Sequence, residues 1–240
     1  MDEWFEAGHV AIVTGGSRGL GNALARALLE RGLHVIVDAR DADDLERARA
    51  DLADAGTVIA IAGDVSDADH AHALIGAASR IGRLDLLVNN ASTLGAVPLP
   101  RIETLDSSVL RAAFEVNVVA PLHLVRHALP LLRRSELATI VNVTSDAAVE
   151  AYAGWGAYGA SKAALECASR VLAAELDGTN VRVLVVDPGE MNTQMHRDAV
   201  PEADPRALRD PAASAADVLH AISVTTGTFA RVAVAHGAPA

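Results

Sequence analysis

The sequence predicts an α/β fold: a doubly wound sheet of about seven mostly parallel strands, with helices on both faces. Two observations predict it. Short runs of Val, Ile and Leu recur without polar alternation, which is typical of strands that are covered on both faces in a parallel sheet. Amphipathic segments of helical length separate these runs, and a regular alternation of strand and helix places helices on both sides of one sheet.

The expected strands, in chain order, are residues 9–15, 34–39, 57–64, 84–91, 138–145, 181–189 and 230–235. The expected helices are residues 20–31, 43–55, 67–81, 105–132 and 157–176. The chain has 240 residues without a repeat or a clear linker, so we expect a single domain over residues 1–240.

A polar stretch with three prolines, at about residues 190–214, follows the sixth expected strand. Ligands of open α/β sheets lie beyond the carboxyl ends of the strands, so we interpret this stretch as a candidate substrate lid. A mobile surface loop is the alternative interpretation.

Composition argues against several classes of function. The formal net charge of −11 argues against a surface for nucleic acid or anionic membrane. The most apolar stretch, residues 116–132, contains two prolines and Arg126, so we expect no membrane span. The acidic first nine residues lack the pattern of a signal peptide. The single cysteine, Cys167, excludes an internal disulfide and is expected to be a buried structural thiol. A cytoplasmic protein fits these features.

A glycine-rich turn, "TGGSRGLG" (residues 14–21), directly follows the first expected strand and opens the first expected helix. Gly15, Gly19 and Gly21 allow a tight turn and a close approach of the backbone to a pyrophosphate at the helix N-terminus. The context of strand, turn and helix predicts a Rossmann-type dinucleotide site; a glycine-rich turn without a ligand is the alternative.

Several motifs in this order resemble the short-chain dehydrogenase/reductase family, in its compact single-domain form. They are "TGGSRGLG", "GDV" (63–65), "VNNAS" (88–92, with Ser92 where the family usually has glycine), "VNVTS" (141–145), "YGASK" (158–162) and "DPGEMNT" (187–193). The likeness covers nearly the whole chain. It implies a nicotinamide cofactor bound by Gly15, Ser17, Arg18, Gly19, Leu20, Gly21, Arg40, Asp64, Val65, Asn90, Ala91, Tyr158, Lys162, Pro188, Gly189 and Thr193.

The residues after the second expected strand favour NADP(H) over NAD(H). In the family, an acid that selects NAD stands just past this strand; here Ala39 and then Arg40 occupy the place. Arg18, in the glycine turn, can reach the same 2′-phosphate, which needs basic partners. Asp38 would favour NAD if the strand ended one residue earlier, but along a regular strand it points away from Ala39.

Tyr158 and Lys162 form the expected catalytic centre. They are four residues apart, so on a helix they share one face. A free phenol has a pKa of about 10, and a nearby ammonium would lower it towards a value useful for proton transfer. Lys162 is the only lysine beside 19 arginines, which suggests that its compact charge and three donors are required there. An exposed surface pair is the alternative.

The family resemblance assigns two further catalytic residues. It implies that Ser145 orients the substrate carbonyl, with Thr144 as the adjacent rival, and that Asn117 holds a water against the lysine. A buried amide that satisfies a helix kink is a compatible alternative for Asn117. The implied reaction is hydride transfer between nicotinamide and a carbonyl or secondary alcohol, with Tyr158 as general acid or base.

Aromatic residues point to the substrate side. Tyr152 and Trp155 lie between Ser145 and Tyr158 and suggest a wall for an apolar or ring-bearing substrate, with ordinary packing as the alternative. Further lining candidates are Glu150, Met191, Met195 and His196. No metal is expected: the pair His123 and His127 lacks a third ligand, and His70 and His72 are interpreted as solvated.

Two other functions stay open at this point. One is a non-redox enzyme on the same scaffold, such as an NADP-using epimerase or dehydratase. The other is a regulatory protein that binds the cofactor without catalysis. Family members are commonly tetramers, so the resemblance implies a dimer or tetramer formed through helices 105–132 and 157–176. The last residues, "ARVAVAHGAPA", depart from the family's usual V-D-G-G ending.

Overall fold

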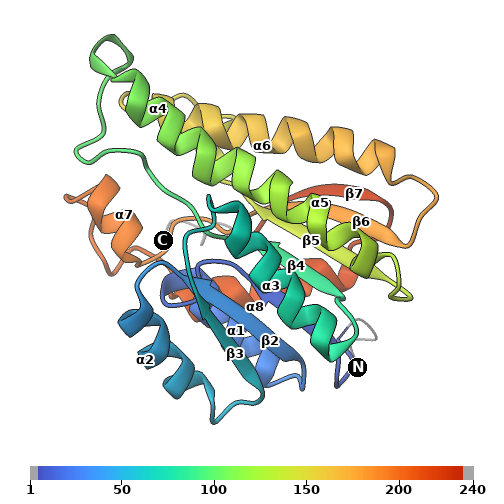
Figure 1. The fold of residues 1–240 in the computed structure, drawn as a ribbon. Helices are drawn as coiled ribbons and strands as arrows, with labels where there is room; N and C mark the ends of the chain where they lie inside the picture. The colour runs from blue at the N-terminus through green and yellow to red at the C-terminus, as the bar shows by residue number, and fades with distance from the viewer. Residues whose placement is uncertain (1–4, 235–240) are drawn as a thin grey trace.

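A computed structural model of the chain describes residues 5–234. The first four residues of the acidic N-terminal segment and the last six residues of the tail that departs from the family pattern lie outside this range. Within it, strands and helices alternate along most of the chain (Figure 1).

The sheet is fully parallel, as the uninterrupted Val, Ile and Leu runs predicted. Its seven strands lie side by side in the order β3-β2-β1-β4-β5-β6-β7, with every neighbouring pair parallel. The strand order reverses between β1 and β4, where a ligand crevice is expected in a doubly wound fold. The strands are β1 (Val10–Val13), β2 (His34–Ala39), β3 (Val58–Ala62), β4 (Leu86–Asn89), β5 (Ala138–Val143), β6 (Val181–Asp187) and β7 (Phe229–Ala233).

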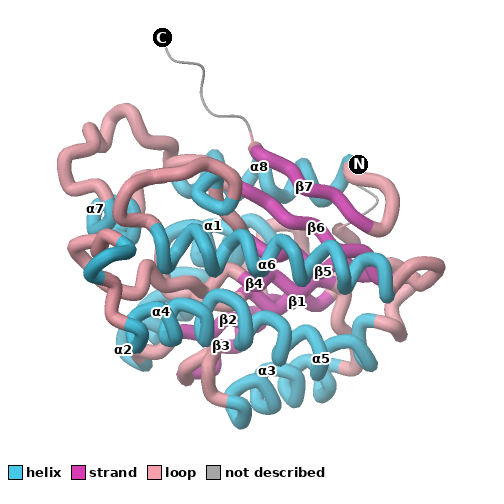
Figure 2. Tube along the Cα trace, turned by 90° about the horizontal axis from the view of Figure 1, so that it is seen from above, coloured by secondary structure: helices cyan, strands magenta, loops and turns pink. Residues whose placement is uncertain are grey.

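Two apolar cores lie on the two faces of the sheet, because successive strand residues point to opposite sides. On one face, Ala11 and Val13 pack with α1 (Gly19–Leu29), α2 (Ala42–Leu52) and α8 (Pro211–Val224). On the other, Val10 and Ile12 pack with α3 (Ala68–Ile81), α5 (Ala120–Leu132) and α6 (Gly156–Glu175). Figure 2 shows the helices in layers on either side of the strands.

The expected helix over residues 105–132 is interrupted in the structure. It comprises α4 (Ser107–Phe114), a π-helical turn η2 (Glu115–Val119) that contains Asn117, and α5. The stretch Ser107–Leu132 has 26 residues and contains an 18-residue window with a mean hydropathy of 1.3, which by length and composition alone would suit a membrane span. Core helices of soluble proteins satisfy the same criteria, and Leu124, Val125 and Ala128 of α5 are buried in the core.

The candidate lid is not irregular throughout. It contains the short helix α7 (Gln194–Ala199) and a β-bridge between Met191 and Arg209, and its last residues already belong to α8. No helix is expected at α8 from the sequence pattern, although its start is marked: Asp210 accepts a hydrogen bond from Ala212 N as the N-cap, and Pro211 takes the first helical position.

Candidate active site

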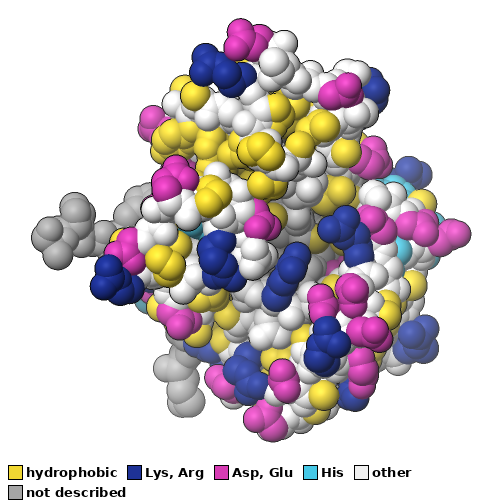
Figure 3. Space-filling view, turned by 90° about the vertical axis from the view of Figure 1, so that its left-hand side faces the viewer, with side chains coloured by type: hydrophobic (Ala, Val, Ile, Leu, Met, Phe, Trp, Pro, Cys, Tyr) yellow, Lys and Arg dark blue, Asp and Glu magenta, His cyan; other side chains and the backbone are white. Residues whose placement is uncertain are grey.

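A large cleft lies at the carboxyl ends of the strands. It encloses about 1490 Å³, and Figure 3 shows hydrophobic side chains above the hollow and basic side chains in its middle and lower part. Gly21 and Asn117 are buried beside the cleft rather than lining it. The other residues of the predicted catalytic, cofactor and aromatic sites line it: Gly15, Ser17, Arg18, Gly19, Leu20, Arg40, Asp64, Val65, Asn90, Ala91, Ser145, Tyr152, Trp155, Tyr158, Lys162, Pro188, Gly189, Met191, Thr193 and Met195. Of the two further lining candidates, His196 lines the cleft, but the prediction for Glu150 is wrong, because its side chain is exposed to solvent outside the cleft.

The glycine turn has the close backbone approach that its sequence predicted. Gly15 and Gly19 have φ values of 69° and 57°, a left-handed conformation that side chains with a Cβ disfavour. A Cβ on Gly21 would lie 2.2 Å from the Gly15 carbonyl oxygen, so only glycine fits there. This packing leaves the unpaired N–H groups at the start of α1 beside the cleft, where they can receive an anion.

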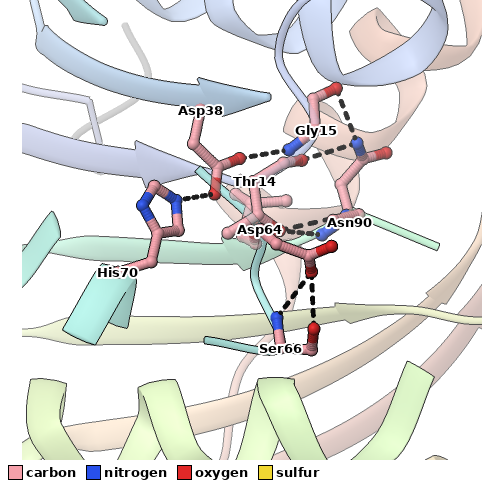
Figure 4. Close-up of polar contacts among 9 residues, drawn as sticks. Thr14, Gly15, Asp38, Asp64, Ser66, His70 and Asn90 are labelled. Atoms are coloured by element: carbon pink, nitrogen blue, oxygen red, sulfur yellow. Dashed lines mark hydrogen bonds and ion pairs between the residues drawn. The ribbon is translucent and has the colours of Figure 1, made fainter. Parts of the chain in front are cut away.

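Asn90 and Thr14 tie the glycine turn to the end of β4. The Asn90 amide nitrogen, Nδ2, donates to the carbonyl oxygens of Thr14 (2.7 Å) and Gly15 (3.3 Å). In return, the Thr14 hydroxyl accepts from the backbone N–H groups of Asn90 and Ala91, each at 3.0 Å (Figure 4). Asn90 therefore holds the backbone of the glycine turn in place.

Asp38 lies at the inner wall of the cleft and is fully buried. One carboxylate oxygen accepts from Gly15 N at 2.6 Å, and the other lies 2.9 Å from Nε2 of His70 (Figure 4). The interpretation of His70 as solvated is therefore wrong, because α3 turns this ring inward to meet the buried carboxylate; His72, two residues on, is exposed.

Two arginines border the part of the cleft next to β2. Arg18, the N-cap residue of α1, and Arg40, directly after β2, are both exposed. Arg40 lies near enough to Asp64 for its charge to help lower the pKa of that carboxyl, after the larger effect of the Ser66 hydrogen bond. The nearby carboxylate of Asp41 is engaged as the N-cap of α2, where it accepts from Asp44 N at 2.8 Å.

The start of α6 brings Tyr158 to the end of β5. A Cβ on Gly159 would lie 2.5 Å from the carbonyl oxygen of Ala147, so α6 packs directly against the 3₁₀ turn η3 (Asp146–Ala148) that follows Ser145. Tyr158 and Lys162 share the inner face of α6 and are 8% and 2% exposed. The alternative of an exposed surface pair is therefore wrong.

The pKa of Tyr158 does not follow the sequence-based expectation. Burial raises it well above the ordinary value, because water no longer stabilises the phenolate. A hydrogen bond with Ser145, and a smaller effect of Ser92, oppose this rise, while the charges of Asp187 and Asp146 add to it. Tyr158 is therefore protonated at neutral pH, the form that can donate a proton.

The Lys162 ammonium lies over the Tyr158 ring and is not among the groups that shift the pKa of Tyr158. Nζ is 5.5 Å from the ring centroid and donates to the carbonyl oxygen of Val143 at 2.8 Å. Burial lowers the pKa of Lys162 itself to about 8. The lysine is thus fixed between the tyrosine and the end of β5, but close to losing its proton in mildly alkaline solution.

The structure distinguishes Ser145 from its neighbour Thr144. The Thr144 hydroxyl is buried and donates to the Glu166 carboxylate at 2.7 Å, so it is engaged away from the cleft. Glu166, one turn after Lys162 on α6, also accepts from Nε of Arg231 on β7 at 3.1 Å. This buried network was not predicted from the sequence. The available signal was that Glu166 stands four residues after Lys162, which places both on the same face of a helix.

We expect Glu166→Ala to lower the free energy of unfolding by about 2 kcal/mol, because it leaves a buried hydroxyl and an arginine without their acceptor. The expected loss is smaller than for a fully buried ion pair, because the Arg231 side chain is 28% exposed and water screens its charge. Urea denaturation measures it. Glu175→Ala, an exposed glutamate on the same helix, is the matched control and should change stability by less than about 0.5 kcal/mol. Equal effects of the two substitutions would contradict the network.

Asn117 is buried and its side chain is fully engaged. Its oxygen accepts from Thr93 N (2.8 Å) and the Ser92 hydroxyl (3.1 Å), and its nitrogen donates to Thr93 O and the Ser161 hydroxyl, both at 2.9 Å. This is the buried amide at a helix irregularity that the sequence left as an alternative. Ser92 therefore connects Asn117 with Tyr158, a link that a glycine at this position would lack.

The hydrophobic wall of the cleft contains the predicted aromatic residues. Trp155 lies edge-on to both Tyr152 and Tyr158, with ring centroids 6.1 and 5.6 Å apart. Met195 of α7 packs against the same cluster. Thr193, just before α7, lies 3.3 Å from the place that a Cβ on Gly19 would take, so the segment after β6 reaches the glycine turn.

His72 of α3 joins the two histidines of α5. Its ring centroid lies 4.3 Å from that of His127 and 6.4 Å from that of His123. Even so, the part of the chain that the structure describes contains no group of three His, Cys, Asp or Glu arranged to hold a metal ion. Cys167 is exposed, contrary to the prediction of a buried thiol, because α6 turns Glu166 inward and the next residue outward.

Comparison with known proteins gives a consistent result. A family model described as short chain dehydrogenase matches residues 9–204. A "Rhamnolipids biosynthesis 3-oxoacyl-[acyl-carrier-protein] reductase" of Pseudomonas aeruginosa is 39% identical over 213 residues, 87% of this chain and 82% of the relative. A putative short chain dehydrogenase from Pseudomonas syringae superposes with a TM-score of 0.89 at 32% identity, covering 98% and 97% of the two chains. A Pseudomonas aeruginosa active-site complex with NADP superposes with a TM-score of 0.83 at 33% identity, covering 97% and 98%.

Proposed function

The chain belongs to the short chain dehydrogenase family, and from this premise we propose that it is an NADP(H)-dependent carbonyl reductase or alcohol dehydrogenase. The observation that carries the proposal is the meeting of Ser145, Tyr158 and Lys162 in the same cleft as the glycine turn. A positioned phenol, a hydroxyl beside it and a dinucleotide-type turn together suit hydride and proton transfer.

The residues of the cleft fit a nicotinamide dinucleotide. The glycine turn provides a cradle that a Cβ at Gly21 would fill, with the N-terminus of α1 as the place for the pyrophosphate. Arg18 and Arg40 would hold the 2′-phosphate of NADP, because Asp38 is turned inward and already bound to Gly15 and His70. The NADP complex of a relative at 33% identity supports the same choice.

In carbonyl reduction, a reduced nicotinamide bound in this cleft would supply the hydride to the carbonyl carbon. Tyr158 donates its proton to the carbonyl oxygen, since burial keeps the phenol protonated near neutral pH. Ser145 orients the carbonyl by donating its O–H to the same oxygen. Lys162, held by the Val143 carbonyl with its ammonium over the Tyr158 ring, keeps the ring in place and would donate to the ribose hydroxyls of the cofactor. In alcohol oxidation, Tyr158 takes up the proton instead.

Residues 190–210, with α7, would close the substrate side as a lid. This part of the proposal is supported by the place of Thr193 against the glycine turn and of Met195 against the aromatic wall. We also propose assembly into a dimer or tetramer through η2 and α6, where Val119 and Val171 are 48% and 54% exposed.

The proposal is tested by following the absorbance of reduced cofactor with a panel of ketones and secondary alcohols. Turnover with NADPH supports it. Tight binding of NADPH with no turnover of any carbonyl would contradict it and favour the epimerase, dehydratase or regulatory alternatives.

For cofactor choice, we expect Arg18→Ala and Arg40→Ala each to raise the Kd of NADPH by about 10- to 100-fold, because each removes a charge-assisted bond to the 2′-phosphate. The Kd of NADH should stay within about 3-fold, since that cofactor lacks the phosphate. Both arginines are exposed, so the fold should be preserved. Fluorescence titration measures both constants, and Arg31→Ala, an exposed arginine outside the cleft, is the control. Equal weakening of NADPH and NADH would contradict this choice.

A further inference from the structure

Asp146 directly follows Ser145 in the chain and lies on the wall of the cleft. Its Oδ1 accepts from the Ser145 hydroxyl at 2.7 Å and from Ala147 N at 2.8 Å. Its Oδ2 accepts from the Tyr152 hydroxyl at 2.8 Å. One carboxylate therefore connects the serine beside Tyr158 to the aromatic residue that forms the outer wall.

Substrate binding must change this arrangement. A serine hydroxyl has only one hydrogen to donate, and the proposed reaction requires Ser145 to donate it to the substrate carbonyl. The hydrogen bond from Ser145 to Asp146 is then broken, and a partly buried carboxylate that loses a donor is destabilised. A substrate with its own donor beside the carbonyl can replace the lost bond.

The charge of Asp146 also acts on the substrate directly. Asp187 is the other carboxylate whose charge reaches Tyr158, and Glu190 lines the same end of the cleft. Of the basic residues there, Lys162 is held by Val143, and Arg197 by Asn192 and Gln194. His196 lies 3.7 Å from the Glu190 carboxylate, which offsets its charge when the ring is protonated. A substrate carboxylate next to Asp146 would therefore meet a like charge at close range, which is strongly unfavourable.

We propose that Asp146 is a specificity-determining residue that selects carbonyl substrates with a hydrogen-bond donor, a hydroxyl or an ammonium, on the carbon next to the carbonyl, and rejects 2-oxo carboxylates. The proposal rests on the carbonyl reductase function proposed above. It also gives Tyr152 a second task, because the bond to Asp146 holds that ring as the wall against which the substrate lies.

Four probes of one shape test this selection: 1-phenylethanone, 2-hydroxy-1-phenylethanone, 2-amino-1-phenylethanone and 2-oxo-2-phenylacetate. The phenyl ring suits the aromatic wall, and only the group next to the carbonyl changes. We expect kcat/KM of the wild type to be about 10-fold higher for the hydroxy and amino ketones than for the plain ketone, the effect of one hydrogen bond. The oxo acid should be about 100-fold poorer than the plain ketone.

Asp146→Asn keeps an acceptor for Ser145 and removes the charge. We expect the advantage of the amino ketone to fall by about 10-fold and the oxo acid to improve by about 10-fold, while the hydroxy ketone changes little, because charge-assisted bonds are about twice as strong as neutral ones. In the pH–rate profile for oxidation of the corresponding alcohol, the rising limb should move to lower pH. The charge of Asp146 helps raise the pKa of Tyr158, so its removal lets the tyrosine act as a base at lower pH.

Glu150→Gln is the matched control. It removes one carboxylate from the same loop at an exposed position outside the cleft, and it should leave the order of the four probes unchanged. If it reorders them as much as Asp146→Asn does, general charge rather than Asp146 sets the preference, and the proposal is overturned. An unchanged order in Asp146→Asn overturns it as well.

A binding measurement separates this proposal from the proposed function. Dissociation constants of the four probes for the NADP⁺-loaded wild type and Asp146→Asn, measured by ligand-observed NMR, should follow the same order as kcat/KM. If the wild type reduces none of the probes, the reductase function loses support, and the order of these constants still decides whether Asp146 selects ligands. Equal affinities for all four probes in both proteins would overturn the selection.

Discussion

Tyr158→Phe is expected to lower kcat for carbonyl reduction by about 1000-fold, which lies within the range for loss of a positioned general acid. The substitution removes only the hydroxyl, so the packing of the ring against Leu94, Ala147 and Trp155 should persist. The Kd of NADPH should change by less than about 10-fold, because the loss concerns proton transfer rather than binding. Steady-state kinetics with one ketone and fluorescence titration with NADPH measure the two effects.

The other tyrosine of the chain provides a matched control. Tyr152 lies in the same aromatic cluster, but it is 46% exposed and its hydroxyl bonds to Asp146. Tyr152→Phe should therefore reduce kcat by less than about 10-fold, the effect of one lost hydrogen bond. If Tyr158→Phe kept more than a third of the wild-type kcat, the proton donor would have to be another group.

Lys162→Arg is expected to reduce kcat/KM by at least about 100-fold although the charge is kept, because a planar guanidinium does not replace a compact ammonium. The site offers the lysine one acceptor, the Val143 carbonyl, in a space that is 2% exposed. A guanidinium with five donors cannot satisfy them there. The same kinetic assay measures the loss, and circular dichroism shows whether the fold is kept.

Arg170→Lys is the control for this exchange, because it makes the opposite change two turns further along α6, at an exposed residue. Its activity should match the wild type. Lys162 is the only lysine of the chain, so ¹³C-lysine labelling gives a single side-chain signal, and its titration should report the pKa of about 8. Wild-type activity in Lys162→Arg would show that any cation suffices and would contradict the assigned role.

The strand pattern was predictable because burial on both faces leaves a direct mark in the sequence. The second expected strand, 34–39, matches β2 in both its bounds, and the others differ from β1, β3, β4, β5, β6 and β7 by a few residues at the ends. The missed helix α8 had a visible start at Asp210 and Pro211. It was hidden by the prolines before it, which made the whole stretch resemble a loop.

Other features depend on contacts between distant segments. The residues around Asp38 in the sequence do not indicate that His70, 32 residues away, meets its carboxylate. Likewise, the residues around Glu166 do not indicate that α6 turns it towards Thr144 and Arg231. The pKa of Tyr158 is the sharpest case. The spacing of Tyr158 and Lys162 predicted a lowered value, but burial and the carboxylates of Asp187 and Asp146 raise it.

The parallel sheet, the glycine turn and the pairing of Tyr158 with Lys162 could be predicted because they depend on local periodicity and on residues that are close along the chain. The partners of Asp38, the way Asn117 is held and the bonds by which Asp146 joins Ser145 to Tyr152 became visible in the folded chain. Hydrogen bonding and desolvation depend on which groups the fold brings near a side chain, and these two effects set its protonation and its partners.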